Sequence, residues 1–562
     1  MSTKSHFSSF DIFDTCLVRT CGTPENFFDV LSTRVFKHPV PENERQGFVI
    51  ARRIIETKAY HNSPKSNIYD IYKEFSFKHS DILPNSELLE IELALEKEVL
   101  VPVLKVKETI DKLRDKGNQI MFISDMYLPA EFLSKILESF DIYKPGDKLF
   151  VSCDIGKTKF NGEIYRYIHN TEGIPYKKWT HYGDNERCDV KEPQKLGIKT
   201  VHIIHKYSTF EQGWIDKGNV TTFKKNHILA GISRALNYSL PEHPRKLLLL
   251  DIVAPLYASF VCSVFEDARK RNITSLYFCA RDTYHMFQVA KVFNYLYPEI
   301  KIHYLKVSRK SLSNTDSETL IKFFEQEGLA STTLNTAIID SSSTGGSHSI
   351  INNLLIKYNY KETFAYFLIK WREFDPLTNN ASPVMRQLYI NSKKNNTVFN
   401  RIKLVALIEN VFSSNNQKST IGYKVDNSHI TPIYNEHIDN QDCFQNDIDN
   451  IQEYHKLLLT SFAKKYIDLG LCHFSFEILH NISIPSLCEF AYYPTKEYTE
   501  SLKTCFLKEN DIILPYVKKE SLFRLIRTRA HDTCWSRATI FYNTPRWIHK
   551  HLLRYIDSKE SL

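Results

Sequence analysis

The order of apolar and polar positions predicts a chain in which short strands alternate with helices. Short apolar runs occur at 119–124 and 179–184, and a β-prone cluster ends the stretch 7–13. Short runs without alternation are typical of parallel strands that are covered on both faces. Between them, stretches such as 46–58 and 87–98 place apolar residues at helical spacing. The first 215 residues therefore predict an α/β domain.

The same alternation returns further along the chain. Strands are expected at 275–280, 301–307 and 337–340, within a second Rossmann-like α/β domain over 226–390. The longest apolar run, 247–265, is broken by an aspartate and a proline, so we expect a buried helix and not a membrane span. Residues 391–562 are predicted to be mainly helical, with an exposed polar loop at 413–417.

Polar side chains that can carry chemistry follow the predicted strands of the first domain. Asp11 ends the first strand, Ser124 ends another, and Asp184 and Asp189 follow a third, while Lys159 precedes a helix. The carboxyl ends of parallel strands meet at one edge of a sheet, so we expect these side chains to converge. Carboxylates bind Mg²⁺ and can act as nucleophiles, and a lysine can hold a phosphate. The pattern predicts a phosphoryl-transfer site.

In this order and spacing, the segments resemble the haloacid dehalogenase (HAD) superfamily of hydrolases over residues 1–210. The resemblance implies a Rossmann-like parallel sheet, a helical cap over about 22–115, a Mg²⁺ cofactor and a phosphorylated small-molecule substrate. It implies that Asp11 is the nucleophile, that Ser124 and Lys159 hold the phosphoryl oxygens, and that Asp184 and Asp189 form the acidic metal-binding motif. Within that motif, Asp189 would orient Lys159 or a metal-bound water. The main-chain carbonyl of the residue at position 13 would be a further metal ligand.

One position departs from the phosphatases of this superfamily, in which a second Asp two residues after the nucleophile acts as acid and base. Here that residue is Phe13, and the next acid is Asp14. A phenyl ring cannot protonate a leaving group. Asp14 could supply the proton, the leaving group could need little protonation, or the site could bind a phosphorylated ligand without turnover. The Phe-Asp-x-Phe-Asp-Thr pattern itself resembles a HAD branch found beside bacterial surface-polysaccharide enzymes.

These observations predict a Mg²⁺-dependent phosphohydrolase or phosphotransferase that acts through an aspartyl-phosphate. The substrate class would be a phosphorylated sugar or a nucleotide-like metabolite. The alternative is a ligand-binding or regulatory protein that keeps a HAD fold with weakened catalysis.

The second domain carries a candidate ligand site of its own. Arg281 and Asp282 follow one predicted strand, and Asp340 follows another. A hydroxyl- and glycine-rich loop comes next, with the candidate ligand-binding residues Thr344, Gly345, Gly346 and Ser347. Such a loop can hold a phosphate, although a glycine pair can equally form a plain turn. The loop resembles that of type I phosphoribosyltransferases, which implies a bifunctional enzyme. Arg281 and Asp282 also resemble an Arg-Asp-Gly segment of long HAD proteins.

Composition adds few constraints. Of 562 residues, 42% are hydrophobic and 25% charged, and the net charge is +8, which predicts a globular protein of several domains without a marked nucleic-acid signature. Eleven cysteines without a Cys-x-x-Cys pair, and an N-terminus without a signal-peptide pattern, predict a cytoplasmic protein with reduced thiols. Basic residues alternate with aromatic ones near the C-terminus, which leaves peripheral association with an anionic membrane open.

Overall fold

The computed structural model describes residues 6–218, 224–343, 345–370, 385–386, 390–391, 407–413, 415–426, 429–435, 448–503, 506–509, 512–515, 517–521, 535–545 and 549. The chain divides into two compact units, Met1–Pro241 and Glu242–Leu562, which are described separately. Helix α11 (Lys225–Ser239) falls in the first unit, whereas the sequence placed the start of a second domain at 226. Most of the basic and aromatic C-terminal stretch lies outside the described residues.

The first unit is built on a five-stranded parallel sheet with the order β5-β4-β1-β6-β7. Its strands are β1 (Phe7–Phe10), β4 (Gln119–Ser124), β5 (Lys148–Val151), β6 (Trp179–Gly183) and β7 (Lys199–His202). Phe10 pairs with Phe122 of β4 and with Tyr182 of β6. The three strands predicted from the apolar runs are therefore neighbours, and their carboxyl ends lie side by side.

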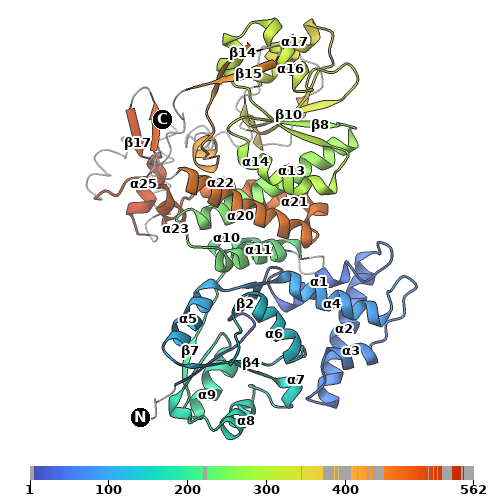
Figure 1. The fold of residues 1–562 in the computed structure, drawn as a ribbon, viewed down its shortest axis with the longest axis vertical. Helices are drawn as coiled ribbons and strands as arrows, with labels where there is room; N and C mark the ends of the chain where they lie inside the picture. Colours follow the sequence, from blue (N-terminus) through green and yellow to red (C-terminus); the bar gives the residue numbers. More distant parts are fainter. Residues whose placement is uncertain are drawn as a thin grey trace. The chain divides into compact units, whose positions relative to one another are not determined.

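Helices surround this sheet, and a separate group of helices lies beside it (Figure 1). The separate group comprises α1 (Pro24–Ser32), α2 (Glu42–Asn62), α3 (Ile68–Glu74) and α4 (Asn85–Val99). The remaining helices are α5 (Leu104–Asp115), α6 (Ala130–Ser139), α7 (Ser152–Ile155), α8 (Glu163–Glu172), α9 (Glu192–Lys195), α10 (Thr209–Asp216) and α11. Two short antiparallel strands, β2 (Leu17–Arg19) and β3 (Leu100–Pro102), lead into and out of the separate group. Helix α5, which the sequence included in the cap, contacts β4 of the sheet.

The second unit holds another parallel sheet, with the order β12-β11-β10-β8-β9. Its strands are β8 (Ser275–Cys279), β9 (Lys301–Leu305), β10 (Thr336–Ser343), β11 (Phe364–Lys370), β12 (Met385–Arg386) and β13 (Ile390–Asn391), which pairs with β11. The fold is α/β with parallel sheets, as the sequence predicted. The helices that flank this sheet are α14 (Tyr284–Phe293), α15 (Arg309–Asn314), α16 (Ser317–Gln326) and α17 (Gly346–Lys357).

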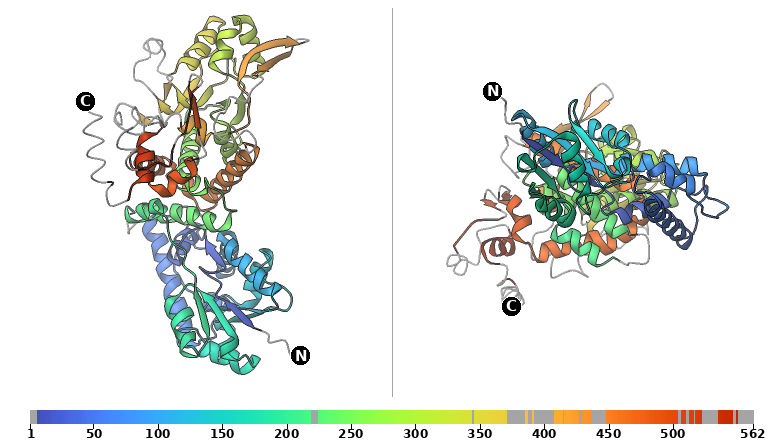
Figure 2. Two further views of the ribbon diagram at one scale, coloured as in Figure 1. Left: turned by 90° about the vertical axis from the view of Figure 1, so that its left-hand side faces the viewer. Right: turned by 90° about the horizontal axis from the view of Figure 1, so that it is seen from below.

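The apolar run of the second unit forms a continuous helical stretch made of α12 (Lys246–Leu248), η3 (Leu249–Val253) and α13 (Ala254–Lys270). Its length and composition would suffice to cross a membrane, but 94% of its most apolar window is buried inside the protein. Helices α20 (Ile448–Asp468) and α21 (Ser475–Ile478) fold back onto α13 (Figure 1 and Figure 2). This packing accounts for the apolar run as a buried helix.

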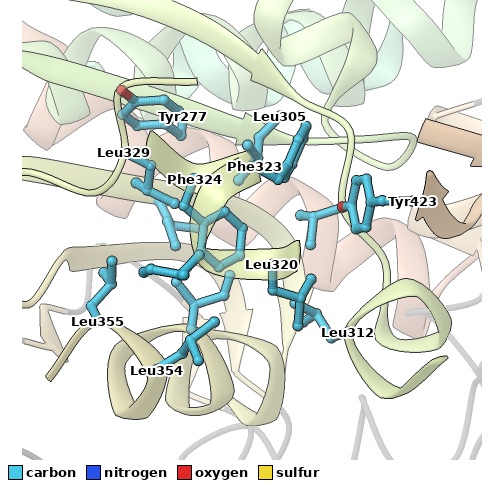
Figure 3. Close-up of a cluster of buried hydrophobic side chains, with 14 of the residues drawn as sticks. Tyr277, Leu305, Leu312, Leu320, Phe323, Phe324, Leu329, Leu354, Leu355 and Tyr423 are labelled. Carbon is cyan, nitrogen blue, oxygen red and sulfur yellow. The ribbon is translucent and has the colours of Figure 1, made fainter. Parts of the chain in front are cut away.

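A buried cluster joins the second sheet to a hairpin from further along the chain (Figure 3). Tyr277 and Leu305 from the sheet, and Phe323 from α16, pack together with Tyr423. Tyr423 belongs to the antiparallel hairpin β14 (Thr420–Asp426) and β15 (His429–Tyr434), and its ring lies 4.3 Å from that of Phe323. The hairpin is therefore part of the core of the second sheet.

The C-terminal region is mainly helical where it is described. Besides α20 and α21 it contains α22 (Ile484–Tyr492), α23 (Lys496–Thr499), α25 (Ser536–Asn543) and the hairpin β16 (Phe506–Glu509) with β17 (Ile512–Pro515). The prediction of an exposed loop at 413–417 is wrong for Ser413 and Asn415, which are 0% and 1% exposed. These polar side chains are buried because they hydrogen-bond to main-chain oxygens of the segment that follows β8.

Candidate active site

The carboxyl edge of the first sheet gathers the residues that the sequence selected. Asp11 directly follows β1, and its N–H donates to the main-chain oxygen of Tyr182 at 2.8 Å. Ser124 is the last residue of the adjacent strand β4, and Asp184 directly follows β6 on the other side. Three neighbouring strands therefore place a carboxylate, a hydroxyl and a second carboxylate at one edge.

Lys159 joins two of these carboxylates. Its Nζ donates to Asp11 Oδ1 at 2.6 Å and to Asp189 Oδ1 at 2.8 Å, and all three side chains are buried. Asp11, Asp184 and Asp189 each place one oxygen within 4.8 Å of the others. The structure thus brings together four residues that lie up to 178 positions apart in the sequence.

Asp189 is fixed from both sides by groups that the sequence analysis missed. Its Oδ1 also lies 3.1 Å from His181 Nε2, and its Oδ2 accepts the N–H of Asn185 at 3.0 Å. Ser9 Oγ lies 2.7 Å from His181 Nδ1 and accepts the indole N–H of Trp179 at 2.7 Å. Because the indole can only donate, the Ser9 hydroxyl proton is available for Nδ1, which leaves the Nε2 proton for Asp189.

The loop that carries Lys159 is anchored by another acid that sequence reasoning missed. Both carboxylate oxygens of Asp125 accept the main-chain N–H of Lys159, at 3.0 and 2.9 Å. Asp125 immediately follows Ser124, so its place after a predicted strand was a signal that could have been used. Burial raises its pKa, although the Lys159 charge acts against that rise.

The charges of the cluster are not balanced by Lys159 alone. Burial raises the pKa of Asp11 to about 8, in spite of Lys159 and with the help of Asp189 and Asp184. Burial also raises the pKa of Asp184 to about 6, and the Asp14 and Asp189 charges add to that rise. For Asp189 burial is outweighed by Lys159 and His181, which hold its pKa below the ordinary value. A further positive charge would therefore stabilise the ionised carboxylates of the cluster, and their hard oxygen donors suit Mg²⁺.

Phe13, which replaces the expected acid, contacts a cation. The Arg19 guanidinium lies 4.4 Å from the centre of the Phe13 ring. Arg19 also donates to both carboxylate oxygens of Glu96 on α4, at 3.0 and 3.3 Å, and both side chains are buried. Phe13 is therefore held by a guanidinium that is itself fixed to the separate helical group.

Asp14 pairs with Arg234, a residue outside the predicted motifs. Its backbone has a φ of 52°, in the left-handed region that few non-glycine residues adopt. Its Oδ1 accepts a hydrogen bond from Arg234 NH2 at 3.1 Å, from helix α11. The neighbouring Thr15 Oγ1 lies 3.5 Å from Asp184 Oδ1, so this loop borders the carboxylate cluster.

The second unit places its predicted residues at a point where the strand order reverses. Because β9 and β10 lie on opposite sides of β8, the edge between the carboxyl ends of β8 and β10 is a topological switch point. Ligands of open α/β sheets bind at such points. Arg281 and Asp282 follow β8, and Asp340 lies in β10.

Charged groups from separate segments meet near this edge. Burial raises the pKa of Asp282 to about 8, together with the charges of Glu409 and Asp340 and against those of Arg281 and Arg309. Glu409 comes from the helical turn η5 (Leu407–Phe412), which the sequence did not select.

The glycine pair of the second unit begins a helix. Gly345 has a φ of 92° and precedes α17, whose first residues are Gly346 and Ser347. Thr344 lies outside the described residues. The structure thus puts the start of α17 directly after β10.

Comparisons with known proteins give similarity to HAD structures over part of the chain. No family model and no curated protein matches. A HAD phosphatase from Thermococcus onnurineus is 19% identical, with a TM-score of 0.27, over 36% of this chain and 87% of its own. The HAD-hydrolase YfnB from Bacillus subtilis, solved with magnesium, is 16% identical, with a TM-score of 0.26, over 35% and 89%. A HAD family enzyme from Bacteroides thetaiotaomicron is 15% identical, with a TM-score of 0.27, over 37% and 98%. At these scores we take no function from the similarity.

Proposed function

We propose that the first unit is a Mg²⁺-dependent phosphohydrolase or phosphotransferase of the HAD type. The observation that carries the proposal is the buried cluster in which Lys159 bonds Asp11 and Asp189, with Asp184 within 4.8 Å. A lysine and several carboxylates at one sheet edge match the needs of phosphoryl transfer, which are positioning and neutralisation of charge.

Asp11 is the nucleophile of this proposal. One carboxylate oxygen attacks phosphorus, the bond to the leaving oxygen breaks, and an aspartyl-phosphate forms on Asp11, which water then hydrolyses. Lys159 holds Asp11 in place, and Ser124, at the end of the adjacent strand, binds a phosphoryl oxygen. A divalent cation held by Asp11, Asp184 and the Phe13 carbonyl would neutralise charge on the phosphoryl group.

Of the roles that the resemblance implies for Asp189, the orientation of Lys159 fits its contacts best. Its two oxygens already accept hydrogen bonds from Lys159, His181 and Asn185, so we assign it the positioning of Lys159. This leaves Asp11 and Asp184 as the carboxylate ligands of the cation.

The test is phosphate release from a broad panel of phosphorylated sugars and nucleotides, with and without Mg²⁺. Asp11→Asn should lower metal-dependent release by at least about 1000-fold, because an amide is a poor nucleophile. The matched control is Asp115→Asn, an exposed acid at the end of α5, which should keep full activity. Release that survives Asp11→Asn would refute the assignment. Binding of a phosphorylated compound without release would favour the ligand-binding alternative, with Phe13 as its reason.

We propose as a second candidate function that the second unit binds a phosphorylated sugar or ribose, which would make the chain bifunctional. The switch point between β8 and β10, with Asp340 in β10 and Asp282 after β8, supports this proposal. The test is calorimetric titration with phosphoribosyl pyrophosphate and with hexose phosphates, in Mg²⁺. Asp340→Asn should weaken binding by about tenfold or more, the size of one lost charge-assisted hydrogen bond. Unchanged affinity after Asp340→Asn and after deletion of Gly345 and Gly346 would count against it.

A further inference from the structure

Helix α11 packs unusually close to the turn that follows β2. A Cβ built on Gly231 of α11 would lie 2.4 Å from the main-chain nitrogen of Gly22 and 2.6 Å from the main-chain carbon of Cys21. Only a glycine permits this approach of helix backbone to loop backbone. Because Arg234 lies three residues further on, it shares the face of α11 that meets this loop.

Arg234 is buried there, and not all of its N–H donors have acceptors among the described residues. Its side chain is 9% exposed, and one N–H of its NH2 group bonds Asp14 at 3.1 Å. The guanidinium lies 4.6 Å from the centre of the Tyr207 ring. Its Nε is buried and has no hydrogen-bond partner among the described residues. A guanidinium has five N–H donors in a planar fork suited to carboxylate and phosphate. The unpaired Nε, in a side chain that is nine-tenths buried and bonded to Asp14 beside the cluster, points to an anionic ligand.

The surroundings of Arg234 border the proposed catalytic cluster. Asp14, its partner, directly precedes Thr15, whose Oγ1 lies 3.5 Å from Asp184 Oδ1. His205 Nε2 lies 3.4 Å from the main-chain oxygen of Thr15, the residue beside Asp184. An open hollow of about 660 Å³ is lined by residues of 205–216, among them His205 and Tyr207. One of its lining residues, Tyr207, is also the residue whose ring contacts the Arg234 guanidinium.

We propose that Arg234 binds a second anionic group on the leaving-group side of the substrate. The substrate class is then a phosphoester whose leaving group carries a carboxylate or a further phosphate. The anion takes the place of Asp14 on the guanidinium and also accepts the Nε proton, a bidentate arrangement that a single Asp14 oxygen does not provide. This inference rests on the proposed phosphotransfer function of the first unit.

The test compares pairs of substrates that differ only in the second charge, using the full-length protein with Mg²⁺. Glycerol phosphate is paired with phosphoglycerate for a carboxylate, and a hexose monophosphate with its bisphosphate for a phosphate. Arg234→Met should raise KM for the doubly anionic member by about 10- to 100-fold, the range of a lost charge-assisted hydrogen bond. KM for the singly charged member should change less than about 3-fold, and kcat should hold for both.

A matched control separates this role from a structural tether. Arg114 of α5 also pairs with an acid, donating to Asp147 at 2.7 Å, and its Nε is likewise buried without a partner among the described residues, but it lies away from the cluster. Arg114→Met should leave both KM values unchanged. If Arg234→Met fails to fold, Arg234→Lys keeps the charge without the fork and should raise only the KM of the doubly anionic member. An equal KM change for both members of a pair would overturn the proposal.

A second measurement makes the two proposals fail separately. Calorimetric titration of Asp11→Asn with the same compounds measures binding without turnover, and addition of Arg234→Met should remove the preference for the doubly anionic member. Suppose that Asp11→Asn binds the doubly anionic member more tightly, that the double variant loses this preference, and that the wild type hydrolyses no compound. The proposal of a phosphohydrolase is then refuted, and the proposal of an anion site at Arg234 is supported. If hydrolysis depends on Asp11 but no pair shows a preference, the anion site fails.

Discussion

Gly183 sits where the proposed site has no room for a side chain. A Cβ at this position would lie 2.5 Å from both Cβ and Cγ of Asp189 and 2.7 Å from its Oδ2. To regain the 3.4 Å of an ordinary contact, Asp189 must move by about 1 Å. Its hydrogen bonds to Lys159, His181 and Asn185 measure 2.8, 3.1 and 3.0 Å, so a shift of that size breaks or bends them.

The size of the effect of Gly183→Ala follows from this geometry. Overpacking of a buried site costs about 1–3 kcal/mol, which we expect as a loss of stability of the first unit. Because Asp189 positions Lys159, and Lys159 holds Asp11, a displacement of about 1 Å should lower kcat by about 10- to 100-fold. KM for a given substrate should change less, since the phosphate-binding hydroxyl of Ser124 stays in place.

The assays are thermal unfolding and steady-state phosphate release on the substrate found for the wild type. Gly47→Ala is the control, because Gly47 lies in α2 and its Cβ would meet only the Phe77 ring at 3.6 Å, an ordinary contact. Alanine there should be neutral or stabilise by up to about 1 kcal/mol. Wild-type kcat and stability in Gly183→Ala would refute the view that Asp189 must stay where it is. Equal losses in both variants would show that the effect is not specific to the site.

Three further outcomes are expected. Glu92→Leu leaves the fully buried Arg52 without its bidentate partner and should lower the free energy of unfolding, measured with urea, by about 3–5 kcal/mol. Arg52→Met in the same chain should recover most of that loss. A loss below about 1 kcal/mol in Glu92→Leu would contradict this. If Asp14 protonates the leaving group, Asp14→Asn should slow phosphate release from alkyl phosphates by about 100-fold or more. Release from nitrophenyl phosphate, whose leaving group needs little protonation, should slow far less. Equal slowing for both substrates would exclude that role. Burial lowers the pKa of His348 to about 4, so its neutral form stabilises the second unit above pH 6.5 and this stability is lost toward pH 4. The free energy of unfolding should fall by about 2 kcal/mol from pH 7 to pH 5, and by less in His348→Gln. The same pH dependence of stability in both proteins would contradict this.

Strand positions could be predicted from the sequence because apolar runs in a parallel sheet depend on local composition. The run at 119–124 became β4 with the same bounds, and the residues after β1 and β6 proved to be the clustered carboxylates. The carboxyl ends of parallel strands meet at one edge of a sheet, and this alone predicted that the carboxylates lie close together.

The residues that were missed depend on contacts distant in the sequence. Arg234 lies 220 residues from Asp14, on a helix whose own sequence gives no sign of a charged partner. His181 lies within a strand, where an imidazole carries no local signal of its bond to Asp189. Ser413 and Asn415 have the composition of an exposed loop and are buried because the segment after β8 offers carbonyl acceptors. Tertiary acceptors of this kind override composition.

The contact between Arg19 and Phe13 has a consequence for any attempt to convert this site. An engineer who wished to install a conventional acid would replace Phe13 with aspartate. That carboxylate would lie beside a guanidinium already fixed to Glu96, and the ion pair would keep it deprotonated, without the proton that a general acid must give. Two positions are therefore linked in any such conversion. An acid at 13 could act as a general acid only after Arg19 is replaced, and replacing Arg19 leaves the buried Glu96 unpaired.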